Sequence, residues 1–216
     1  MIGGIRVKVC GLTSVADAAA AAGIGADFLG FILYPKSPRY LAPERFAALR
    51  PGLPELPKVA VLVTPAAAEV TAALAAGFDL LQVHFPLTAA PEVRAALARV
   101  DRRRVWLAPK LPPEAEIAPE LLAWADTWLL DAYRTDSFGG TGQTGDWGKF
   151  RRYREESPTK TWILAGGLGP DNVAAALAET GAEAIDVNSG VESSPGCKDS
   201  RKLDRLRDAL TSRASR

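Results

Sequence analysis

Two side chains that could exchange protons with a ligand each close a short apolar run of the sequence. Cys10 ends the run at residues 6–10, and Asp131 ends the run at 127–131. A thiolate is a base and a nucleophile. A carboxyl group held beside apolar residues has a raised pKa, because desolvation disfavours its charge, and this suits a general acid. The two residues therefore predict acid–base chemistry, if the fold brings them to one place.

Each of the two has a second interpretation. A cysteine on a buried strand is most often a small core residue. To act as a base, Cys10 would need its pKa lowered by a nearby positive charge, and Lys8 lies two residues earlier on the same face. Asp131 could instead cap the following loop by accepting backbone N–H bonds, which would lower its pKa. Both interpretations stay open at this point.

Two glycine-bearing segments, each directly after an apolar run, predict a phosphate site. Small residues let backbone N–H groups approach an anion, and a helix N-terminus adds favourable partial charge. A tight turn at the paired glycines is the alternative. The candidate ligand-binding residues of these segments are Gly166, Gly167, Asp186, Ser189 and Gly190.

Two further side chains are candidates for binding a ligand. Arg39, in the segment 34–40, has a planar guanidinium that suits a carboxylate, although an arginine beside Lys36 could simply be a surface residue. His84 ends another apolar run. It could line a pocket, or its ring could simply form hydrogen bonds with backbone groups. With a single histidine and no CxxC pair, the chain offers almost nothing for a transition-metal site, so we expect no metal and no cofactor.

The elements that must position these residues alternate regularly. Continuous apolar runs are typical of parallel strands covered on both faces, and eight strand–helix units predict a (β/α)8 TIM barrel with its chemistry at the strand C-termini. A doubly wound open sheet is the alternative, but its usual GxGxxG turn is absent. The expected strands are residues 5–10, 28–33, 58–63, 79–84, 104–108, 127–131, 161–165 and 184–188.

Helices are expected between these strands. Proline recurs at the first expected helical turn, at positions 43, 91 and 170, where its missing N–H costs nothing. Residues 132–146 have neither strand nor helix character, and a loop of this length predicts a lid or binding loop. The expected helices include 14–22 with Ser14 as N-cap, 65–76, 114–125, 170–179 and 199–210.

Length and composition limit the function further. The 216 residues fit one barrel domain, 1–216, with a short polar tail after about residue 211. With 26 basic and 25 acidic residues the net charge is +1, so neither nucleic acid nor an anionic membrane is an expected partner. We expect no signal peptide, no membrane-spanning segment and no disulfide. We expect a cytoplasmic protein, monomeric or homodimeric, that binds a small phosphorylated molecule.

At these residues the chain resembles phosphoribosylanthranilate isomerase, an enzyme family of tryptophan biosynthesis. The resemblance covers nearly the whole length in the right order, and its motifs are specific as a set. The matching segments are residues 7–13, 30–40, 82–84, 129–131, 139–142, 146–147, 165–168, 186–192 and 195–199.

The resemblance implies roles for three residues. Cys10 would be the general base, Asp131 the general acid, and Arg39 would hold the anthranilate carboxylate. The reaction implied is a cofactor-free Amadori rearrangement of N-(5-phosphoribosyl)anthranilate to 1-(2-carboxyphenylamino)-1-deoxyribulose 5-phosphate.

The chain departs from the family pattern at Phe85, where glycine is usual, and at Gly145, where an aromatic is common. Because of Phe85, the resemblance does not define the shape of the anthranilate pocket. Because of Gly145, it does not define how its loop packs. A related isomerase of histidine biosynthesis is a second interpretation, but that family has aspartate where this chain has Cys10. A catalytically silent barrel that binds a phosphorylated ligand is a third.

Overall fold

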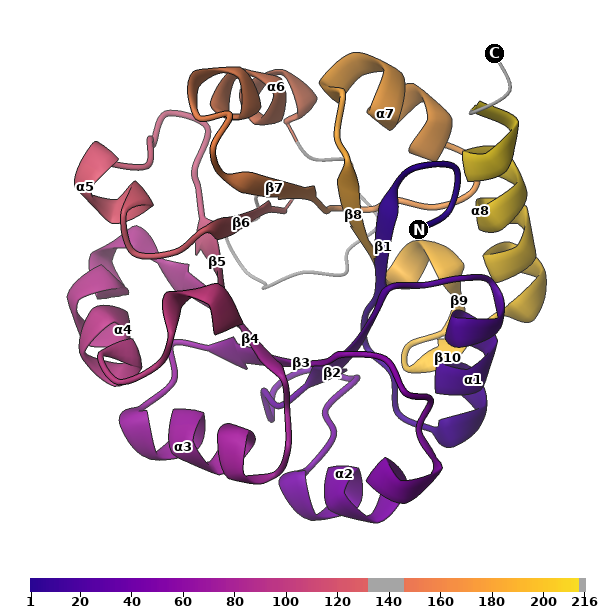
Figure 1. Ribbon diagram of the computed structural model, residues 1–216, viewed down its shortest axis with the longest axis horizontal. Helices are drawn as coiled ribbons and strands as arrows, with labels where there is room; N and C mark the ends of the chain where they lie inside the picture. The colour runs from indigo at the N-terminus through magenta and orange to yellow at the C-terminus, as the bar shows by residue number, and fades with distance from the viewer. Residues whose placement is uncertain (132–145, 214–216) are drawn as a thin grey trace.

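A closed barrel of eight parallel strands forms the centre of the molecule, with the helices outside it (Figure 1). The computed structural model describes residues 1–131 and 146–213. The predicted (β/α)8 architecture is therefore confirmed. The strands are β1 (Arg6–Val9), β2 (Phe28–Ile32), β3 (Lys58–Val63), β4 (Leu80–Pro86), β5 (Val105–Lys110), β6 (Thr127–Leu130), β7 (Thr161–Leu164) and β8 (Ala184–Val187).

The helices follow the strands in alternation. Ser14 is the N-cap of the first helix, as predicted, and its hydroxyl accepts a hydrogen bond of 3.1 Å from the N–H of Asp17. The helices are α1 (Val15–Gly23), α2 (Pro43–Leu49), α3 (Ala67–Ala75), α4 (Ala90–Leu97), α5 (Pro119–Leu122), α6 (Trp147–Glu156), α7 (Val173–Thr180) and α8 (Ser200–Arg213).

Several helix boundaries differ from those expected. α5 has four residues where twelve were expected, and α7 begins after its N-cap Asn172, so Pro170 precedes the helix and does not open it. α8 continues to Arg213, past the expected start of a polar tail. α6 was not predicted; its N-cap Asp146 accepts a 2.8 Å bond from the N–H of Lys149. The predicted lid over 132–146 lies outside the described residues, except for Asp146.

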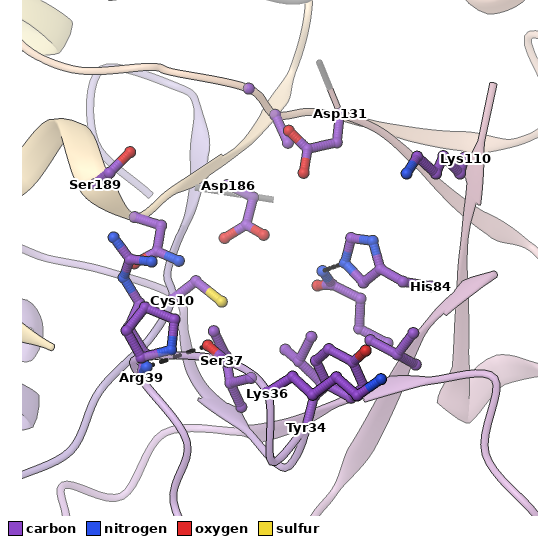
Figure 2. Close-up of a pocket in the computed structure, with 18 of the residues that line it drawn as sticks. Cys10, Tyr34, Lys36, Ser37, Arg39, His84, Lys110, Asp131, Asp186 and Ser189 are labelled. Atoms are coloured by element: carbon purple, nitrogen blue, oxygen red, sulfur yellow. Dashed lines mark hydrogen bonds between the residues drawn. The ribbon is translucent and has the colours of Figure 1, made fainter. Parts of the chain in front are cut away.

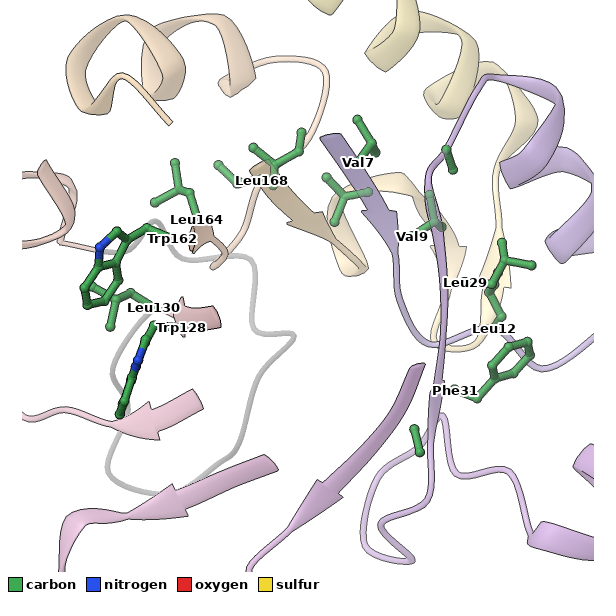
Figure 3. Packing of buried hydrophobic residues seen from close by; sticks show 14 of the residues in the cluster. Val7, Val9, Leu12, Leu29, Phe31, Trp128, Leu130, Trp162, Leu164 and Leu168 are labelled. Carbon is green, nitrogen blue, oxygen red and sulfur yellow. The ribbon is translucent and has the colours of Figure 1, made fainter. Parts of the chain in front are cut away.

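Side-chain alternation along the strands divides the core into two layers. On β5, Val105 and Leu107 pack outward under the helices, whereas Trp106 and Ala108 point into the barrel. The outward layer is the larger, and it joins the strands to the helices (Figure 3). Phe85 belongs to that outward layer and is fully buried there, so it packs behind the strand and not in the barrel interior.

The barrel interior is apolar at one end and polar at the other. Val59, Trp106, Leu129 and Ile163 are among the buried residues that fill the end where the strands begin. One step further along the strands the inward residues include Lys8, Gln82 and Asp186, all buried. These apolar side chains fill the barrel at the end where the strands begin, so a ligand has access only from the C-terminal ends of the strands.

Two smaller expectations concern the surface. The run Arg102–Arg104 forms a short 3-10 turn, η3, before β5, at the opposite end of the barrel from the strand C-termini, and Arg102 and Arg103 are exposed. No helix in the described ranges is long and apolar enough to cross a membrane.

Candidate functional site

A cavity of about 490 Å³ opens at the C-terminal ends of the strands (Figure 2). It is where the barrel architecture places chemistry. Of the nine residues named from the sequence, eight line this cavity; Gly190 does not. The eight are Cys10, Arg39, His84, Asp131, Gly166, Gly167, Asp186 and Ser189.

Cys10 stands directly after β1, with its backbone N–H bonded to the carbonyl of Val187 on β8 at 2.8 Å. The residue is 4% exposed and its thiol is free. Burial raises the pKa of Cys10, and the ammonium of Lys8 opposes this without reversing it. Lys8 therefore acts in the direction that the sequence suggested, but the pKa of Cys10 is raised overall because desolvation by the surrounding barrel is the larger effect.

Lys8 and Asp186 form a buried ion pair beneath Cys10. The two are register partners on β1 and β8, and the Lys8 ammonium lies 2.9 Å from each carboxylate oxygen. Burial alone would lower the pKa of Lys8, but Asp186 and Cys10 outweigh it and raise the pKa. A methyl group on Gly30 would lie 2.8 Å from Lys8 Nζ and 3.1 Å from Cys10 Cα. Glycine at that position therefore leaves the ammonium room beside Cys10.

Asp131 lies at the end of β6 and is half-buried. Its carboxylate points into the cavity from a different wall than the thiol of Cys10 (Figure 2). Lys110, at the end of β5, reaches into the cavity near Asp131. A ligand in the cavity would thus have an acid on one side and a base on the other.

His84 and Gln82 share the β4 wall of the cavity. Gln82 Nε2 donates a hydrogen bond of 2.9 Å to His84 Nε2, because an amide nitrogen can only donate. Burial, and then the charge of Lys8, lower the pKa of His84 to about 4. The imidazole is therefore neutral near pH 7 and serves as a hydrogen-bonding group, not as a cation. Gln82 Oε1 is buried without a hydrogen-bond partner among the described residues.

The glycine-bearing loops after β7 and β8 meet at one corner of the cavity. Gly166 and Gly167 have φ angles of 95° and 60°, which side-chain-bearing residues rarely adopt. Within residues 1–131 and 146–213 their N–H groups donate no hydrogen bond. Gly190 packs behind the corner, since a Cβ there would lie 2.1 Å from the carbonyl oxygen of Leu168. The Cα of Gly190 is thus packed closely against backbone, and Ser189 is the residue of that loop that lines the cavity.

Arg39 is not a surface residue. Its Nε lies 2.9 and 3.0 Å from the two carboxylate oxygens of Glu192, and its Nη2 lies 2.7 Å from Oε2. Glu192 begins β9 (Glu192–Ser194), which pairs with β10 (Cys197–Lys198) in a small antiparallel hairpin after β8. The Lys198 ammonium bonds the same carboxylate at 2.9 Å and the side-chain oxygen of Asn188 at 3.0 Å.

Sequence reasoning missed Lys110, Asn188, Glu192 and Lys198. The period-2 rule applied to β5 would have placed Lys110 on the inward face with Trp106. Glu192 carried no such signal, because it pairs with Arg39 from about 150 residues away, and Lys198 pairs in turn with Glu192.

The sequence and the fold were compared with known proteins. The model of the family described as N-(5'-phosphoribosyl)anthranilate (PRA) isomerase matches residues 7–209. The N-(5'-phosphoribosyl)anthranilate isomerase of Magnetococcus marinus is 41% identical, over 94% of this chain and 93% of that protein. That of Synechococcus sp. is 37% identical, over 96% of each.

Solved structures give the same result. Phosphoribosyl anthranilate isomerase from Thermotoga maritima superposes with a TM-score of 0.80 at 31% identity, covering 96% of this chain and 99% of that one. A second structure of such an isomerase, at 29% identity and TM-score 0.77, contains reduced 1-(o-carboxyphenylamino)-1-deoxyribulose 5-phosphate and covers 96% and 99% of the chains. The chain belongs to the N-(5'-phosphoribosyl)anthranilate isomerase family.

Proposed function

We propose that this protein isomerises N-(5'-phosphoribosyl)anthranilate to 1-(2-carboxyphenylamino)-1-deoxyribulose 5-phosphate, a step of tryptophan biosynthesis. Family membership supports the activity. The observation that carries the mechanism is that a thiol and a carboxyl group, Cys10 and Asp131, face one cavity from different walls. General acid and general base catalysis needs this placement, with the substrate between the two groups.

The first step opens the sugar ring. Asp131 in its protonated form donates its proton to the furanose ring oxygen, and the C1–O bond breaks. The nitrogen lone pair forms a C1=N double bond, which gives an open-chain iminium cation and leaves Asp131 ionised.

The second step moves a proton from carbon. The iminium acidifies the C2–H, and the Cys10 thiolate removes that proton while the electron pair shifts to nitrogen and yields an enolamine. Tautomerisation of the enolamine then gives the ketone. The ammonium of Lys8 favours the thiolate, whereas burial and the Asp186 carboxylate disfavour it. Cys10 is therefore mainly the neutral thiol at rest. Because catalysis needs Cys10 ionised and Asp131 protonated together, we expect activity to have a bell-shaped dependence on pH.

The two ends of the substrate would be held by different walls. The N–H groups at Gly166 and Gly167, with the Ser189 loop opposite, suit the phosphate. Arg39 suits the anthranilate carboxylate. Asp186, His84 and the Oε1 of Gln82 offer hydrogen-bonding groups to the ribulose hydroxyls and the amine.

A fluorescence assay tests the function. Freshly made phosphoribosylanthranilate is fluorescent through its anthranilate group, and purified protein should make that fluorescence decline with saturation kinetics. A protein that binds reduced 1-(o-carboxyphenylamino)-1-deoxyribulose 5-phosphate but does not convert phosphoribosylanthranilate would instead be a catalytically silent barrel.

The corner of the cavity where the glycine-bearing loops after β7 and β8 meet gives a binding prediction. Inorganic phosphate or sulfate should occupy the space between the backbone N–H groups of Gly167 and Ser189–Gly190, and should inhibit competitively with the substrate. A crystal soaked in sulfate checks the position, and inhibition kinetics check the competition. An anion bound elsewhere, with this corner empty, would contradict the proposed phosphate site.

Two properties of the whole molecule remain predictions. We propose that the protein works in the cytoplasm, where both free cysteines would stay reduced. Its oligomeric state is proposed as monomer or homodimer, which light scattering on the purified protein distinguishes.

A further inference from the structure

Arg39, Glu192 and Lys198 form a buried group of two cations and one carboxylate, called here the Arg39 cluster. Their side chains are 8%, 4% and 0% exposed, respectively. Arg39 reaches the cavity, but Lys198 and Glu192 do not line it. Glu192 bonds both cations and so links Lys198 to Arg39.

The charges of the Arg39 cluster do not cancel. With both cations protonated, the cluster has one net positive charge in a place from which water is largely excluded, and such a charge is costly without a partner. Burial would raise the pKa of Glu192, but Arg39 and Lys198 hold it below its usual range. Burial lowers the pKa of Lys198, and Glu192 opposes this only in part.

Neighbouring groups in the described part of the chain do not supply the missing negative charge. Cys10 is close enough to Lys198 for their charges to interact, but burial raises the pKa of the thiol and keeps it neutral at rest. Asp186 is paired with Lys8. Asp199 accepts a 2.9 Å bond from the N–H of Arg201 at the start of α8. Lys202 approaches with a further positive charge, 2.6 Å from the carbonyl oxygen of Glu192. An anion entering from the cavity would balance the cluster.

We propose that Lys198 is a positioning residue that allows Arg39 to select a ligand with a carboxylate. Without Lys198, Arg39 and Glu192 would be a neutral pair, and Glu192 would repel a second carboxylate. With Lys198 sharing Glu192, Arg39 keeps an unbalanced charge, and its Nη1 is engaged by no residue in the described ranges. This inference rests on the proposed function, because the substrate's anthranilate end carries that carboxylate.

Two ligands that differ only in the carboxylate test the proposal. One is reduced 1-(o-carboxyphenylamino)-1-deoxyribulose 5-phosphate, and the other is its phenylamino counterpart without the carboxylate. Calorimetry gives Kd for both. Lys198→Met should weaken the carboxylated ligand about tenfold or more and change the other less than about twofold. The control Lys202→Met removes a cation that bonds only the main chain of Glu192, and it should leave the ratio of the two affinities near the wild-type value.

A double variant separates charge from mere packing. Lys198→Met combined with Glu192→Gln restores one net positive charge on Arg39, so selectivity for the carboxylated ligand should recover most of the way to wild type. A double variant as weak as Lys198→Met alone, or an equal loss for both ligands, would overturn the proposal. Binding of the phenylamino ligand confirms that each variant is folded. Failure of the wild-type protein to convert phosphoribosylanthranilate would instead count against the proposed function.

Discussion

Replacing Cys10 with serine is expected to lower kcat by about a hundredfold or more, the scale for losing a general base. Serine keeps the size and position of the side chain, but its hydroxyl hardly ionises near neutral pH, even beside Lys8. KM should change little, because the thiol acts on the proton at C2 and not on the groups that hold the substrate. Steady-state kinetics and calorimetry with the reduced product analogue measure the two effects separately.

Cys197→Ser is the matched control, since that thiol is exposed on the β9–β10 hairpin. It should retain wild-type kcat. The pH profile adds a further check: catalysis needs Asp131 protonated and Cys10 ionised together, so kcat/KM should be bell-shaped. Cys10→Ser should remove the limb that belongs to the thiol, whose pKa is raised by burial. Equal losses in the two cysteine variants, or full activity in Cys10→Ser, would show that another group is the base.

Strand order and strand position were predictable from sequence because they depend on local patterns. Apolar runs of five or six residues predicted each strand to within two residues at either end, and β3 was placed at its observed limits. Helix starts were less certain where proline was the only signal. Pro91 lies in the first turn of α4, but Pro170 precedes α7, because Asn172 takes the capping position.

The site was predictable where a residue ends a strand, since barrel topology brings all strand C-termini to one rim. Cys10, His84 and Asp131 lie on that rim for this reason. The electrostatics were not predictable. Whether Lys8 lowers the thiol pKa depends on the balance between its charge and the desolvation of Cys10, which requires three-dimensional burial. The partners of Arg39 lie in a hairpin that follows β8 and is far from Arg39 in the sequence.

Asp131→Asn is expected to have the other large effect, a loss of roughly a hundredfold to ten-thousandfold in kcat. Asparagine is nearly isosteric with aspartic acid, keeps an acceptor oxygen and can donate a hydrogen bond, yet it has no proton to transfer to the ring oxygen. The variant should therefore fold with near-native stability and bind the reduced product analogue well, while the sugar ring stays closed.

The alternative role of Asp131, capping the loop that follows β6, predicts the reverse pattern. A lost carboxylate cap would reduce the free energy of unfolding by about 1 kcal/mol and leave kcat nearly unchanged. Melting temperature and kcat, measured on one preparation, distinguish the two roles. The ring-opening step can also be bypassed, because a substrate already in the open-chain iminium form would not need the acid. Asp131→Asn should convert such a substrate at close to the wild-type rate, because Cys10 is intact. A stable and fully active variant on the closed-ring substrate would falsify the proposed acid.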